Sequence, residues 1–145
     1  MSEDDQLRAD EIQPTGGWIR ELLTEEGESL WSLRVECRAV ERPYGSTPLN
    51  VEVDCVDFGL PAGDGLAGAE AVLVGDDDEP SASVYFFEHY AYDRAVVRVL
   101  SRQGERARVS VELAEDLYGL GLERISLTAE VEVVPAVRAV SSSLD

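Results

Sequence analysis

Apolar and polar residues alternate along several segments of the chain, and the apolar residues take every second position. The apolar set of residues 31–39 is Trp31, Leu33, Val35, Cys37 and Ala39. Residues 49–55 and 125–133 repeat this alternation. Because successive side chains of a strand point to opposite faces, the period of two predicts strands with one buried face.

Glycine-containing turns indicate how two pairs of strands fold back on each other. Gly104 suits the left-handed position of a three-residue hairpin loop, which would pair Val97 with Val109 on one apolar face. Residues 25–27 have the same form and predict a second hairpin. Residues 18–26 are also compatible with a short helix that ends at a glycine.

Turn-forming residues also separate the apolar runs 69–74 and 82–88. The acidic cluster at 76–80 ends in a proline, which predicts a third hairpin between these runs. Residues 114–121 are the best place for a helical turn. Together the segments predict an all-β fold, a single antiparallel β-sandwich or open barrel of about eight strands with at most one or two short helical turns.

The length of 145 residues suits one domain with one core. We expect residues 1–14 to form an acidic flexible arm, residues 15–140 a single β domain and residues 141–145 a polar tail. The chain starts with acidic residues where a secretory signal is basic and then apolar, so we expect cytoplasmic synthesis without a signal peptide. No apolar run has the length of a membrane-spanning helix, so no membrane partner is expected.

Charge is the most unusual feature of the composition. The chain has 30 acidic residues against 12 basic ones, all of them arginine, and its formal net charge is −18. Salt screens the self-repulsion of such a chain, so the composition favours a halophilic host. A GC-rich genome would explain the missing lysine but not the excess of acid. The same charge repels phosphates, and no nucleic-acid partner is expected.

The two cysteines, Cys37 and Cys55, fall on the apolar faces of predicted strands. Two cysteines are too few for a disulfide scaffold, and their spacing differs from that of a zinc site. We therefore expect both thiols to be reduced and buried on neighbouring strands.

Few residues are suited to catalysis. His89 is the single histidine and no Gly-x-Ser-x-Gly motif accompanies it, so we assign no catalytic residue and expect a non-enzymatic protein. The acidic run offers oxygen ligands to calcium, the one cofactor that the sequence leaves open. Its members are Asp76, Asp77, Asp78 and Glu79. A solvated turn is the alternative interpretation, because the whole chain is acidic.

Two apolar segments have few of the acidic residues that protect most strands of this chain from pairing with a partner, and in the aromatic stretch Glu88 is the only acid before Asp93. The first is the aromatic stretch 85–92, whose candidate interface residues are Tyr85, Phe87, Tyr90 and Tyr92. The second is the valine-rich end of the chain, with candidates Val131, Val133, Val134 and Val137. Exposed aromatic residues dominate interface energetics and apolar strand ends accept partner strands, so both segments predict contacts with other chains. Packing on both faces of a central strand is the alternative for the aromatic stretch.

Three hypotheses about function follow. The first is a non-enzymatic structural or interaction subunit of a larger assembly, of the virion, tail or appendage type, which forms a homo- or hetero-oligomer in a halophilic host. The second is an acidic inhibitor or immunity-type protein that neutralises a basic partner, because the charge would speed association with a cationic surface. The third is a calcium- or ligand-binding β-sandwich.

Overall fold

The computed structural model describes residues 6–25, 29–59, 66–74 and 82–138, the side chains of Cys55 and Arg138 excepted. In this part of the chain eight strands follow one short 3-10 helix, η2. The elements are η2 Ala9–Glu11, β1 Pro14–Leu23, β2 Ser29–Arg42, β3 Gly45–Val56, β4 Glu70–Val74, β5 Ala82–Phe86, β6 Glu88–Gln103, β7 Arg106–Asp116 and β8 Arg124–Arg138.

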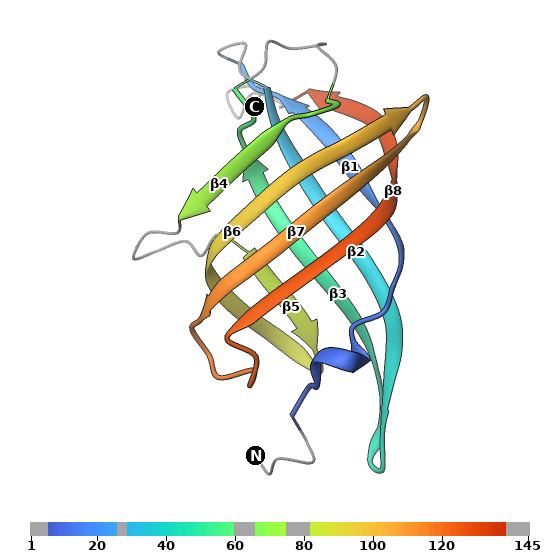
Figure 1. Ribbon diagram of the computed structural model, residues 1–145, viewed down its shortest axis with the longest axis vertical. Helices are drawn as coiled ribbons and strands as arrows, with labels where there is room; N and C mark the ends of the chain where they lie inside the picture. Colours follow the sequence, from blue (N-terminus) through green and yellow to red (C-terminus); the bar gives the residue numbers. More distant parts are fainter. Residues whose placement is uncertain (1–5, 26–28, 60–65, 75–81, 139–145) are drawn as a thin grey trace, which may run out of the picture.

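Seven of these strands close into a barrel, and β4 adds to its outside edge (Figure 1). The order around the barrel is β6, β5, β3, β2, β1, β8 and β7, and β7 pairs again with β6. Every pair is antiparallel except β1 with β8, which is parallel. The predicted all-β fold of about eight strands is confirmed, as a closed barrel of mixed pairing.

Alternating residues of each strand fill the barrel interior, as the period of two requires. Fully buried interior side chains include Ile19, Leu33, Val35, Val51, Val53, Val97, Val109 and Val111. The β-branched residues that dominate this set pack well between pleated strands. The segments with the clearest alternation therefore supply the core.

The hairpin of β6 and β7 forms, but its register differs from the predicted one. Val97 lies opposite Val111, and Val99 lies opposite Val109. The turn is tighter than expected, because Gln103 pairs with Arg106 and Gly104 adopts a φ of +60° in the turn. A shift of two residues leaves every side chain on its face, so the predicted face is right although the register is wrong.

The other two predicted hairpins have opposite outcomes. β1 and β2 pair as expected, with Leu22 opposite Leu30, so residues 18–23 are strand and not helix. The hairpin between β4 and β5 is wrong. β4 pairs with β6 through Val72 and Val96, whereas β5 lies between β3 and β6. The acidic cluster at 76–80 lies outside the described residues.

Residues 114–121 contain no helical turn, contrary to the prediction. The carboxylate of Asp116 instead accepts hydrogen bonds from the backbone N–H groups of Tyr118, Gly119 and Gly121, at 3.3, 2.9 and 3.1 Å. An aspartate that captures local N–H groups competes with helical hydrogen bonds and stabilises a turn. The segment therefore ends β7 and begins the loop to β8.

The N-terminal arm is packed against the barrel over its described part, which corrects the expectation of a flexible arm over residues 1–14. Leu7 is buried in the core cluster. Glu11, at the end of η2, makes an ion pair with Arg42 at the end of β2. This contact holds η2 across the lower end of the barrel in Figure 1. Residues 1–5 and 141–145 lie outside the described residues.

Candidate functional site

Two exposed aromatic side chains meet at one end of the barrel. Tyr44 lies in the turn between β2 and β3 and is 62% exposed. Phe87 lies in the turn between β5 and β6 and is 37% exposed. Their ring centroids are 5.3 Å apart. We call this pair the aromatic tip, because exposed rings in contact are typical of surfaces that bind another molecule.

The backbone of Phe87 is held in a conformation that phenylalanine avoids. Its φ is +62°, in the left-handed region, which costs roughly 1–2 kcal/mol for a residue with a Cβ. The N–H of Phe87 donates a hydrogen bond of 2.9 Å to the hydroxyl of the buried Thr47, and the ring packs on Phe86 at 5.2 Å. Non-glycine residues in this region cluster at functional sites, so the strain supports a role for the exposed ring.

A second apolar group projects from the same end of the barrel. Leu117 and Tyr118 lie in the loop between β7 and β8, and both are half or more exposed. Glu115, which precedes this loop, is the other non-glycine residue with a positive φ among the described residues. Figure 1 places the β2–β3, β5–β6 and β7–β8 connections at the lower end of the barrel, with the β2–β3 connection on the right and the β7–β8 connection on the left.

Acidic side chains lie close to the aromatic tip. Glu88 follows Phe87 directly, and Asp116 precedes the second apolar group. Burial raises the pKa of the Tyr90 hydroxyl, and the nearby Glu88, Tyr44 and Asp116 raise it further. A surface with apolar rings and an acidic rim is complementary to an apolar patch that is ringed by basic residues.

Of the four predicted aromatic interface residues, only Phe87 is exposed. Tyr90 and Tyr92 are buried, so their assignment to an interface is wrong. The Tyr92 hydroxyl donates a hydrogen bond of 2.5 Å to the carbonyl of Leu122, and burial raises its pKa. Tyr85 is half-buried against the ring of His89. The alternation breaks here because the chain reverses at Phe87, which the prediction of one continuous aromatic strand missed.

The valine-rich end is covered by the chain itself. Val131 is buried, and Val133 and Val134 are half-buried along the parallel pairing of β8 with β1. Val137 is exposed and lies opposite Leu22. The predicted exposed strip is therefore wrong for Val131, because β1 closes the barrel where a partner strand was expected.

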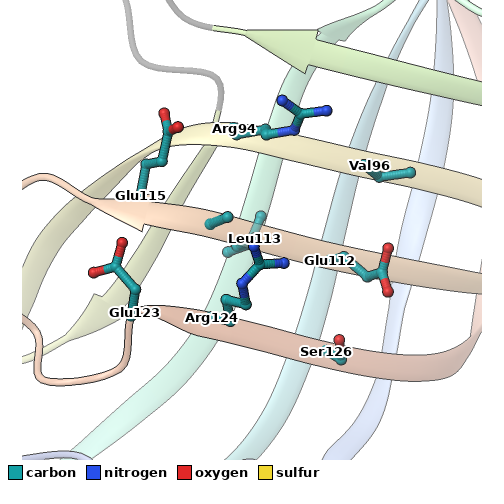
Figure 2. A pocket seen from close by; sticks show the side chains of 9 residues that line it. Arg94, Val96, Glu112, Leu113, Glu115, Glu123, Arg124 and Ser126 are labelled. Carbon is teal, nitrogen blue, oxygen red and sulfur yellow. The ribbon is translucent and has the colours of Figure 1, made fainter.

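A shallow groove of about 620 Å³ crosses the outer surface of β6, β7 and β8 (Figure 2). Ala114 lies opposite Arg94 on one side and Arg124 on the other, and the small side chain leaves a hollow between the two arginines. Glu115 and Glu123 lie at one end of the groove. No ion pair of Arg94 or Arg124 is present within the described part of the chain.

The remaining candidates offer little chemistry. The ring of His89 packs edge-on against Tyr85, with 5.1 Å between the ring centroids. Across residues 6–25, 29–59, 66–74 and 82–138, no three His, Cys, Asp or Glu side chains gather as metal ligands. The predicted calcium ligands Asp76 to Glu79 lie outside these ranges, so that site stays a prediction.

Cys37 is a free thiol that is half-buried beside the core, which is less burial than predicted. Its strand pairs with the strand of Cys55, as expected, although Cys37 itself lies opposite Leu49. Burial raises the pKa of the Cys37 thiol to about 11.

We expect Cys37 to react slowly with alkylating reagents in the folded protein. At pH 8 a pKa near 11 leaves about one thiol in a thousand ionised, and the greater nucleophilicity of a basic thiolate offsets only part of this loss. Iodoacetamide labelling of a Cys55→Ser variant should be about tenfold slower when folded than in urea. Equal rates would contradict this burial.

Sequence reasoning missed Tyr44, Leu117 and Tyr118. Tyr44 lies between Pro43 and Gly45, and a proline followed two residues later by glycine marks a turn between the strands on either side. An aromatic residue in so short a turn has no core to enter. This local signal predicts an exposed ring without any knowledge of the fold.

Among the described residues, no helix combines the length and the apolar character that crossing a membrane requires. Comparison with known proteins gives no relative, so any functional conclusion rests on the barrel and its aromatic tip. No protein-family model, no curated protein and no solved structure matches this chain.

Proposed function

We propose that this protein is a non-enzymatic interaction subunit of a larger protein assembly, and that it binds its partner chain through the aromatic tip. The strained, exposed ring of Phe87 beside Tyr44 is the observation that carries this proposal. Folding alone would favour a glycine at Phe87, because glycine adopts a positive φ without strain. A bulky ring held outward at this position is accounted for by a contact with another molecule.

The energetics of interfaces support the same site. Aromatic anchors near the centre of an interface contribute most of its binding free energy, at 2 kcal/mol or more for each hot-spot residue. Tyr44 and Phe87 present two rings side by side, and Leu117 and Tyr118 add apolar surface at the same end. These side chains give this end of the barrel its exposed apolar surface.

The acidic rim defines the chemistry of the partner. Glu88 and Asp116 flank the apolar groups, and the whole chain carries a formal net charge of −18. A partner with an apolar pocket and surrounding arginine or lysine residues fits this end best. In a halophilic virion, tail or appendage, salt would screen the long-range repulsion and leave the apolar contact to hold the subunits.

The acidic rim also favours a second function, that of an inhibitor or immunity-type protein that covers a basic active site. The two functions use the same surface and differ in the complex that they form. An inhibitor gives a complex of one chain with one basic protein, whereas an assembly subunit gives a particle with many copies.

Phe87→Gly is expected to separate binding from folding. The substitution removes the backbone strain as well as the ring, so the free energy of unfolding should stay within about 1 kcal/mol of the wild-type value. Partner binding should weaken at least 30-fold, since a hot-spot residue contributes about 2 kcal/mol or more. The measurement is the native size of the tagged chain in gentle extracts of the cells that produce it.

Tyr44→Ala tests the other ring, and Leu100→Ala is the matched control, because Leu100 is half exposed on β6 away from the tip. Wild type and Leu100→Ala should elute as one large complex. Phe87→Gly and Tyr44→Ala should elute near the 15.8 kDa of the single chain. A large complex that survives both tip substitutions would overturn the proposal.

A further inference from the structure

We infer that strand β4 is a second interaction surface, at which two copies of this chain pair their β4 strands antiparallel in a weak dimer. This surface is distinct from the aromatic tip. β4 lies on the outside of the closed barrel, pairs with β6 on one edge, and has no strand partner on its other edge in the part of the chain that the structure describes.

The free edge of β4 has its backbone groups directed outward at alternate residues. The carbonyl of Ala69 accepts a hydrogen bond of 2.8 Å from the N–H of Val99, on the β6 side. Backbone groups alternate between the two edges of a strand, so Glu70, Val72 and Val74 direct their N–H and C=O groups to the free edge. These unpaired groups are a template for another strand.

The exposed side chains of Val72 and Val74 on the outer face of β4 are apolar, at positions where a protected edge strand carries charged residues. Val72 is 54% exposed and Val74 is 66% exposed, and Val72 lies opposite Val96 on β6. Exposed valines along an open edge promote pairing with a second strand, whereas lysine, proline or a bulge would block it. In the described part of β4 only Glu70 carries a charge.

Antiparallel pairing of two β4 strands about Val72 gives hydrogen-bond partners to the outward backbone groups of both copies. The twofold axis places Val72 opposite Val72, and Glu70 of each copy opposite Val74 of the other. The two strands would then exchange about six backbone hydrogen bonds. A contact of this kind is isologous and closed, so it yields dimers and not fibres.

Charge complementarity supports a second copy of this chain as the partner that pairs with the free edge of β4. Arg94 lies opposite Val74 on β6, and Figure 2 shows its guanidinium on the β4 side of that strand. Glu70 forms an ion pair with Arg98 of its own chain through Oε2. In the paired dimer Glu70 is also two strands, or about 10 Å, from Arg94 of the other copy, a gap that the two extended side chains bridge. Each dimer gains two such ion pairs by symmetry.

The surrounding surface favours the same contact. Residues 94–114, which include most of β6 and most of β7, hold five arginines and two glutamates within a chain of net charge −18. Repulsion between two copies is therefore weakest on this face. Salt screens the repulsion that remains from the other faces, so the dimer should tighten as salt rises towards 1 M.

Sedimentation velocity of the full chain in 1 M salt tests the pairing. The wild-type chain should dimerise reversibly with a Kd on the order of 10–100 μM, as expected for a small edge contact. The charge variants are compared in about 0.15 M salt, where exposed charges are screened less than at 1 M, and there Arg94→Glu should raise the Kd at least tenfold because it places like charges together across the axis. Arg124→Glu is the matched control on the same groove, remote from β4, and should leave the Kd unchanged.

Val72→Pro is a second test that acts on the backbone. Proline removes the outward N–H of residue 72 and is tolerated on an edge strand whose N–H faces solvent, so the monomer should fold and fail to dimerise. If this variant does not fold, the comparison of Arg94→Glu with Arg124→Glu decides. A chain that stays monomeric up to about 1 mM, or a dimer that Arg94→Glu does not weaken, overturns the inference.

Discussion

Arg42→Ala is expected to lower the free energy of unfolding by about 3 kcal/mol, because it breaks a buried ion pair and leaves Glu11 with the more distant and exposed Arg8 as its cationic partner. The Arg42 side chain is 5% exposed and binds both carboxylate oxygens of Glu11, at 2.7 and 2.8 Å. It also donates to the carbonyls of Gln6 and Glu41, at 2.9 Å each, and its guanidinium lies 5.3 Å from the ring centre of Phe86. One side chain thus fastens η2 and β2 across the end of the barrel.

The same pair gives stability a defined dependence on pH. The hydrogen bonds from Arg42, opposed by desolvation, lower the pKa of Glu11 from 4.5 to about 2. A carboxyl group whose pKa is lowered by folding contributes stability that is present above pH 4.5 and is lost as the pH falls towards 2. The difference between wild type and Arg42→Ala should therefore shrink over this range.

Urea unfolding at pH 7 and pH 3 measures both effects. Arg8→Ala is the control, because Arg8 also approaches Glu11 but its side chain is 63% exposed, and exposed pairs contribute about 1 kcal/mol or less. A loss below 1 kcal/mol for Arg42→Ala at pH 7 would contradict the structural role assigned to this pair.

Gly17→Ala is the second substitution with a large expected effect, a loss of about 3 kcal/mol or failure to fold. Gly17 lies in β1 opposite Val35, with a φ of +140°. A Cβ at this position would overlap the carbonyl oxygen of Arg34, which is backbone and cannot turn aside. Either β1 moves away from β2, or the residue at position 17 adopts a strained conformation.

Gly16→Ala is the matched control, because a Cβ on Gly16 would meet nothing within 4 Å. Thermal unfolding followed by circular dichroism compares the two variants. Gly16→Ala should melt within a few degrees of wild type, since glycine does not stabilise a strand and the added Cβ has room at this position. Similar melting temperatures for both variants would show that β1 and β2 do not approach as closely as described.

Local patterns in the sequence predict the strands and the faces of this barrel well. The alternation of Leu33 and Val35 or of Val109 and Val111 specifies both a strand and its buried side. The even shift in the β6–β7 register, from Val97 opposite Val109 to Val97 opposite Val111, left those faces correct. Features that depend on the residues of one segment, such as a strand and its buried face, could therefore be predicted.

Pairings between distant segments were not predictable from these patterns. β4 pairs directly with β6, although β5 lies between them in the sequence. β1 pairs in parallel with β8, which comes from the other end of the chain. Apolar alternation states which face is buried but not which strand is the neighbour. Val131 and Val133 were assigned to a partner chain for this reason, since the covering strand lies more than a hundred residues earlier in the sequence.

At the aromatic tip, too, local sequence signals could be read, whereas contacts between distant residues could not. Phe87 was predicted at the interface, but as part of a continuous strand with Tyr90 and Tyr92. The positive φ that turns the chain at Phe87 depends on the hydrogen bond to Thr47, 40 residues earlier. Tyr44 was open to prediction from its turn, whereas its contact with Phe87 required the pairing of β3 with β5.

Site-specific photo-crosslinking in the producing cells tests most directly whether the aromatic tip contacts a partner chain. A benzophenone amino acid at position 44 should give one dominant adduct with a partner protein whose crosslinked surface is apolar and flanked by basic residues. The same group at position 100, equally free to react on β6, should not give that adduct. No adduct from position 44, or the same adducts from both positions, would contradict the proposed function.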